Sequence, residues 1–97
     1  MARVLVVGIG PGGLESVPVG VYRLLTSGRP VYFRTFVHPA AQQLLAEGIE
    51  AFSFDEVYDT EPSFTSVYER ITSALTQAAM VEGEIVYVVP GHPSVGE

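Results

Sequence analysis

The stretch RVLVVGIGPGG, residues 3–13, decides the fold, because a run of apolar β-branched side chains leads directly into a glycine-rich turn. A second stretch, IVYVVPGHP, residues 85–93, has the same order. Strands that are apolar on both faces are typical of a parallel sheet covered by helices. Ligands bind outside the carboxyl ends of such strands, where glycine lets backbone groups approach closely. We therefore expect the two turns to form the walls of one small-molecule cleft.

Strand and helix signals alternate along the chain. Strands are expected at residues 3–8, 31–34, 49–54 and 85–89. Helices are expected within residues 16–28, 38–48 and 62–83, each with a proline near its start and a glycine at its end. The acidic stretch 55–61 is expected to be a loop. The order β-α-β-α-β-α-β predicts an α/β fold, a parallel sheet with helices on both faces.

The helical segments also predict the core. Ser16 is expected to cap the first helix, with Pro18 in its first turn. His38 is expected to start the second helix, directly before Pro39. In the third helix a stripe of apolar side chains is wide enough to cover a sheet, and it consists of Phe64, Val67, Tyr68, Ile71, Leu75 and Ala78. We predict that this stripe and Tyr22 lie in the core.

The composition limits size and partners. The 97 residues are enough for one small domain. The formal net charge is −6, and all 5 basic residues are arginine. Because phosphate binding needs clustered cations, we expect no nucleic acid partner. The absence of cysteine excludes disulfides and cysteine-ligated zinc.

The sequence also bears on the cellular location of the protein and on metal binding. The apolar start is interrupted by Gly-Pro-Gly too early for a signal peptide, and no stretch is long enough to span a membrane. We therefore expect a cytoplasmic protein without a membrane partner. The acidic residues Asp55, Glu56, Asp59 and Glu61 lack the order and the glycine of an EF-hand, so we expect a solvated segment and no metal site.

The last residues, 93–97, have the pattern of a strand-to-helix turn followed by the start of a helix. A domain that ended at such a turn would leave a sheet edge and an apolar face uncovered. We therefore expect the chain to be part of a longer protein.

The first turn also matches Gly-x-Gly-x-x-Gly through Gly8, Gly10 and Gly13. A dinucleotide site of this kind needs a helix that opens within the glycines and an acid at the end of the second strand. Here the helix is delayed to about Pro18, and the second strand ends at Arg34. The pattern therefore does not favour NAD, and the absence of lysine excludes a P-loop.

Several motifs together resemble the tetrapyrrole (corrin and porphyrin) methylase family. They are VGIGPG at 7–12, LES at 14–16, VYRLL at 21–25 and VPGHP at 89–93. Further likeness at 34–39, 53–55 and 67–69 is closest to the YabN-like branch of that family. In that branch a methylase-type domain precedes a MazG-type nucleotide pyrophosphohydrolase domain.

This resemblance implies an S-adenosylmethionine-dependent methyltransferase with the cofactor held between two α/β domains. Residues 1–97 would form most of the amino-terminal domain, with the fourth strand inserted beside the first. The implied cofactor contacts are Ile9, Gly91, His92, Pro93 and Val95. The implied substrate side consists of Gly10, Pro11, Gly12 and, as a candidate for a substrate carboxylate, Arg34. A small-molecule acceptor, a homodimer and a following MazG-type domain are also implied.

Two positions depart from the family pattern. Gly13 stands where an aspartate commonly follows Gly-Pro-Gly, and His92 stands where an aspartate commonly separates glycine from proline. Methyl transfer depends mainly on the alignment of donor and acceptor, so these changes are compatible with cofactor binding. Two hypotheses stay open: a methyltransferase, and a non-catalytic ligand-sensing or dimerisation module attached to a MazG-type domain. No catalytic residue is assigned, and Arg34 has an ion pair with a local acid as its alternative role.

Overall fold

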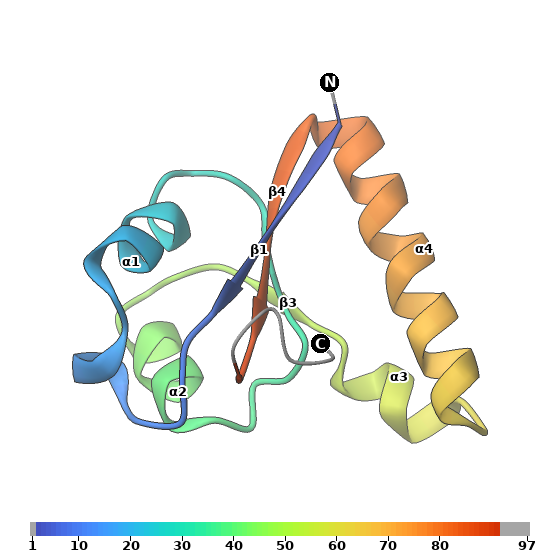
Figure 1. The fold of residues 1–97 in the computed structure, drawn as a ribbon, viewed down its shortest axis with the longest axis horizontal. Coiled ribbons are helices and arrows are strands. Elements are labelled where there is room, and N and C mark those ends of the chain that lie inside the picture. Colours follow the sequence, from blue (N-terminus) through green and yellow to red (C-terminus); the bar gives the residue numbers. More distant parts are fainter. Residues whose placement is uncertain (1, 92–97) are drawn as a thin grey trace.

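The computed structural model of the chain describes residues 2–91 and shows an α/β fold (Figure 1). Within these residues a 4-stranded sheet is formed by β1 (Arg3–Gly8), β2 (Val31–Phe33), β3 (Phe52–Ser53) and β4 (Glu84–Val89). The strand order is β1-β4-β2-β3, and each neighbouring pair is parallel. The last strand in the sequence therefore lies between the first two, as the family resemblance implies.

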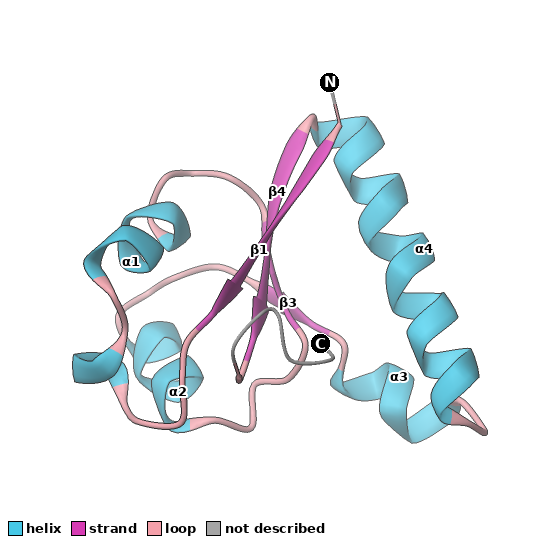
Figure 2. Cartoon of the chain, viewed as in Figure 1, coloured by secondary structure: helices cyan, strands magenta, loops and turns pink. Residues whose placement is uncertain are grey.

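Helices cover both faces of the sheet, which confirms the predicted fold class (Figure 2). They are a short 3-10 helix at Leu14–Ser16, α1 (Val19–Leu25), α2 (Pro39–Ala46), α3 (Asp55–Thr60) and α4 (Phe64–Glu82). The helices α1 and α2 lie on one face, and α4 lies on the other (Figure 1). Among residues 2–91, no helix combines the length and the apolar character that crossing a membrane requires.

The central strand β4 is buried on both of its faces. Val86 and Val88 pack into the core under α1 and α2. Ile85, Tyr87 and Val89 pack into the core under α4. Each fully buried aliphatic side chain of this size contributes about 1.5–3 kcal/mol relative to an exposed one. The continuous apolar run in the sequence is thus explained by helix packing on each side of the sheet.

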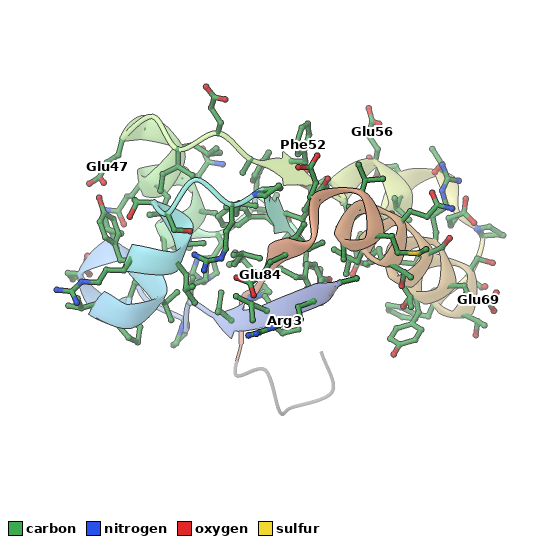
Figure 3. The ribbon with its side chains drawn as sticks, turned by 90° about the horizontal axis from the view of Figure 1, so that it is seen from above. Arg3, Glu47, Phe52, Glu56, Glu69 and Glu84 are labelled. Atoms are coloured by element: carbon green, nitrogen blue, oxygen red, sulfur yellow. The ribbon has the colours of Figure 1, made fainter. Side chains whose placement is uncertain are left out.

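Charged side chains join the amino ends of the strands. The Glu84 carboxylate forms two ion pairs at this edge. Its oxygens lie 2.5 Å from Nε of Arg29 and 3.3 Å from Nε of Arg3. Figure 3 shows Arg3 and Glu84 together at this edge. The hydrogen bond from Arg29 holds the pKa of Glu84 below its ordinary value, although partial burial raises it. These partly exposed ion pairs fix the amino edge, far from the turns that follow the strands.

Two expectations at element ends were wrong. The acidic stretch 55–61 is not a loop, because Asp55–Thr60 forms α3. Its acidic first turn suits the positive end of the helix dipole, and Val57 packs against the core under α4. Ser16 does not cap α1 either: it ends the 3-10 helix, and Pro18 occupies the cap position without a side-chain hydrogen bond.

The third strand and the apolar stripe of α4 also differ from expectation. Only Phe52–Ser53 of the predicted strand 49–54 pairs with β2. In α4 the buried side chains are Val67, Ile71, Leu75 and Ala79. Tyr68 is 68% exposed, because it lies about 100° around the helix from Val67, at the margin of the packed face. Phe64 is 86% exposed, so the predicted stripe is narrower than expected.

Truncating Ile71 and Tyr68 to alanine tests this register of α4. Ile71→Ala should lower the free energy of unfolding by about 2–5 kcal/mol, because it removes a buried side chain. Tyr68→Ala should change it by less than about 0.5 kcal/mol in the 97-residue chain, because this side chain is largely exposed. Urea denaturation measures both values, and equal losses would contradict the register.

Candidate functional site

The turns after β1 and β4 leave the same edge of the sheet. Gly8 pairs with Val89, and the backbone N–H of Ile9 donates to the Val89 carbonyl at 3.1 Å. The turn at residues 10–13 and Gly91 therefore follow the carboxyl ends of two neighbouring strands. The expected neighbourhood of the first and fourth strands is confirmed. Three predicted contact residues, His92, Pro93 and Val95, lie outside the described residues.

Ile9 is almost completely buried at this edge. The whole residue is 1% exposed, its side chain belongs to the core under α1 and α2, and its N–H already donates to the Val89 carbonyl. Gly91 is partly exposed directly beyond β4. The predicted cofactor contact of both residues stays a prediction, and of the two it is Gly91 that is partly exposed at this edge.

Three glycines give the first turn its shape, for different reasons. Gly10 has a φ of 69°, a conformation that costs a residue with a side chain roughly 1–2 kcal/mol. A Cβ on Gly12 would lie 2.7 Å from Ser16 Oγ. A Cβ on Gly13 would lie 2.7 Å from Gln43 Oε1 and 2.8 Å from Glu15 Oε2. The aspartate of the family pattern therefore fits at Gly13 only if these side chains move.

Two side chains of α2 hold the first turn. The Nε2 atom of His38 lies 2.5 Å from the carbonyl oxygen of Gly10. The backbone N–H of Leu14 donates to Gln43 Oε1 at 2.6 Å. The helix α2 thus contacts the turn on both sides of residues 11–13. His38 also caps α2, as predicted, because its Nδ1 accepts from the N–H of Ala40 at 3.0 Å.

Asp55 holds the neighbouring connection between β2 and α2. Its Oδ2 accepts from the backbone N–H of Phe36 at 3.0 Å, and Gln42 Nε2 donates to the carbonyl of the same residue at 2.8 Å. Burial raises the pKa of Asp55, but hydrogen bonds from Phe36 and from the hydroxyls of Thr35 and Ser53 outweigh it and hold that pKa below its ordinary value. The connection that carries His38 is therefore anchored independently of the glycine turn.

Arg34 lies at the carboxyl end of β2, on the face covered by α4. Its backbone N–H donates to the Val88 carbonyl at 2.9 Å. Its side chain lines a cavity of about 300 Å³ together with Val6, Tyr58 and Tyr68. Residues 10–12 do not line this cavity. The structure thus brings Gly10, Pro11 and Gly12 together in one turn after β1, whereas Arg34 follows β2, which β4 separates from β1, and lines a cavity on the opposite face of the sheet.

Sequence reasoning missed the supporting role of α2. His38 was assigned only to the start of a helix, and Gln43 and Asp55 were given no part in the site. The contact of His38 with Gly10 spans 28 positions, so no local pattern contains it. The one available signal is the chemistry of the residues: a histidine at a helix start, two positions before a free N–H, has a second ring nitrogen left to bind elsewhere.

Comparisons with known proteins agree with these observations. The family model described as Tetrapyrrole (Corrin/Porphyrin) Methylases matches residues 3–97. A curated relative, "Uncharacterized protein YabN" of Bacillus subtilis (strain 168), is 39% identical over 95 residues. The match covers 98% of this chain and 19% of the relative, so the chain spans about a fifth of that relative's length.

Alanine at two glycines separates backbone strain from helix propensity. Gly10→Ala should lower the free energy of unfolding by about 1–2 kcal/mol, because φ is positive there although the space is open. Gly20→Ala, in α1, should stabilise by up to about 1 kcal/mol, because no atom lies within 4 Å of its Cβ. Urea denaturation measures both, and a neutral Gly10→Ala would contradict the strained turn.

The lowered pKa of Asp55 predicts a pH-dependent contribution to stability. A carboxyl whose folded pKa is depressed stabilises the fold above its unfolded pKa, and this contribution is lost as the pH falls through the folded pKa. Asp55→Asn should therefore cost about 1 kcal/mol at neutral pH, and the difference from the unmodified protein should shrink in acid. Thermal unfolding across pH measures this, with Asp59→Asn as the control on the same helix. A difference that does not vary with pH would contradict the assignment.

Proposed function

The chain belongs to the tetrapyrrole (corrin/porphyrin) methylase family, and from this premise we propose that it forms the first α/β domain of an S-adenosylmethionine-dependent methyltransferase. One observation carries the placement of the ligand: β1 and β4 are neighbours that end at Gly8 and Val89. Their two glycine turns consequently leave one edge together. Ligands of parallel sheets bind outside such an edge.

The residues present fit a cofactor that is held largely through main-chain groups. Residues 10–13 include three glycines, and the side chain of Ile9 is withdrawn into the core. We assign Ile9 and Gly91 to the cofactor side, together with His92, Pro93 and Val95, and we assign Gly10, Pro11 and Gly12 to the acceptor side. When bound, S-adenosylmethionine would supply an activated methyl group on a positively charged sulfur. The turns would align donor and acceptor, which is the main protein contribution to such a transfer.

Arg34 is our candidate for binding a carboxylate of an acidic, small acceptor. It follows β2 at the same edge of the sheet, and it lines a cavity together with aromatic and aliphatic side chains. Arginine suits this task because its planar donors match both oxygens of a carboxylate. The cavity lies on the face opposite α2. An acceptor that contacted both Arg34 and the turn at residues 10–12 would therefore have to cross the end of the sheet.

The second candidate is a ligand-sensing or dimerisation module without methyl transfer. The surroundings of Gly13 favour it, because Gln43 and Glu15 fill the space that a carboxylate would take. In both cases we propose a cytoplasmic homodimer with a MazG-type domain farther along the full chain. Room for it is supported by the relative, of which this chain covers 19%.

Calorimetry with the full-length protein tests the proposal. S-adenosylmethionine and S-adenosylhomocysteine should both bind, and a radiolabelled methyl group should move to an acidic tetrapyrrole. Residues 1–97 alone should bind at least about 100-fold more weakly, because half of an interdomain cleft leaves much of the ligand exposed. Binding without transfer to any tetrapyrrole acid would select the sensing module. No binding of either compound by the full-length protein would contradict both the cofactor and the activity.

A further inference from the structure

The imidazole of His38 joins two groups that lie far apart in the sequence. Its Nδ1 accepts from the backbone N–H of Ala40 at 3.0 Å, and its Nε2 lies 2.5 Å from the carbonyl oxygen of Gly10. A carbonyl can only accept and a backbone N–H can only donate. Both contacts are therefore satisfied by one tautomer, with the proton on Nε2, which donates to Gly10.

The carbonyl that His38 binds is the only hydrogen-bonding group of the peptide between Gly10 and Pro11. The following residue is Pro11, which has no N–H. Fixing this oxygen fixes the plane of the peptide between Gly10 and Pro11. Gly10 has a positive φ of 69° in the same turn, and a glycine by itself does not favour one backbone conformation. The contact therefore sets the direction in which the turn leaves β1.

The helix α2, which His38 caps, is fixed in the core and contacts the turn at a second point. Ala40, Ala41 and Leu44 of α2 are each 0% exposed, so the helix is fixed in the core. Gln43, on the same helix, accepts from the N–H of Leu14 at 2.6 Å. The turn is thus tied to α2 before and after residues 11–13.

We infer that His38 is a positioning residue, which holds the turn at residues 10–12 in the conformation that its ligand meets. The inference rests on the proposed function for the ligands of this edge: residues 10–12 face the acceptor, and the turn continues directly from Ile9 on the cofactor side, so S-adenosylmethionine is the probe. A turn that is already ordered binds without the entropy cost of immobilising flexible backbone. His38 need not touch the ligand for this effect, since it acts through the Gly10 carbonyl.

Two substitutions separate this role from helix capping. His38→Asn keeps a good N-cap acceptor but is too short to reach Gly10. His38→Gln carries an amide donor near the place of Nε2 but lacks the acceptor that caps α2. Gln77→Ala is the control, because this exposed residue lies in α4, on the opposite face of the sheet from α2.

In the full-length protein, His38→Asn should weaken S-adenosylmethionine binding about tenfold, with a nearly unchanged unfolding midpoint. His38→Gln should bind within about threefold of the unmodified protein, although its unfolding midpoint falls. Gln77→Ala should bind normally. Calorimetry and thermal unfolding provide the two readouts. If affinity is unchanged in His38→Asn, or falls only in step with stability in both variants, the inference is overturned.

A second measurement decides the inference even if the unmodified protein fails to bind S-adenosylmethionine, in which case the proposed function fails. Nuclear magnetic resonance relaxation of glycine-labelled, full-length protein reports backbone motion at Gly10, Gly12 and Gly13. His38→Asn should increase motion at these amides and leave Gly20 unchanged, whereas His38→Gln should restore the order. Unchanged motion at all of these amides in His38→Asn would overturn the positioning role.

Discussion

The parallel pairing of β1 with β4 is the constraint on which the rest of the structure depends. It runs in register from Arg3 with Glu84 to Gly8 with Val89. This pairing inserts the last strand between the first two, so residues that are about 80 positions apart share one edge of the sheet. Burial of β4 on both faces stabilises the arrangement, because its side chains belong to two cores, one under α1 and α2 and the other under α4.

The first glycine turn is held from the face of the sheet that α2 covers. The helix α2 reaches the first glycine turn through His38 and Gln43, while Asp55 fixes the connection that leads into α2. The contacts of His38 and Gln43 lie on the face opposite the cavity that Arg34 lines, whereas Asp55 comes from α3, which packs against the core under α4. A rigid support for a glycine-rich turn is what a site built from main-chain groups needs, since three of the four residues at 10–13 have no side chain to define its shape.

The sequence predicted the α/β class, the order of the main elements and the shared edge of the two turns, because apolar runs and glycine or proline boundaries are local signals. It failed where tertiary contacts decide. Nothing local shows that α3 forms from an acidic segment by packing Val57, or that Tyr68 faces solvent while Ile71 faces the sheet. The site was predicted only as turns, because the contact of His38 with Gly10 exists only after the strands have paired.

A crystal structure of the full-length protein with S-adenosylhomocysteine tests directly whether the paired strands build the binding site. We expect the ligand outside the carboxyl ends of β1 and β4, next to Ile9 and Gly91, with the first turn still tied to His38. A ligand seated instead in the cavity under α4, or at the amino ends of the strands beside Glu84, would contradict the central claim that the paired strands build the binding site.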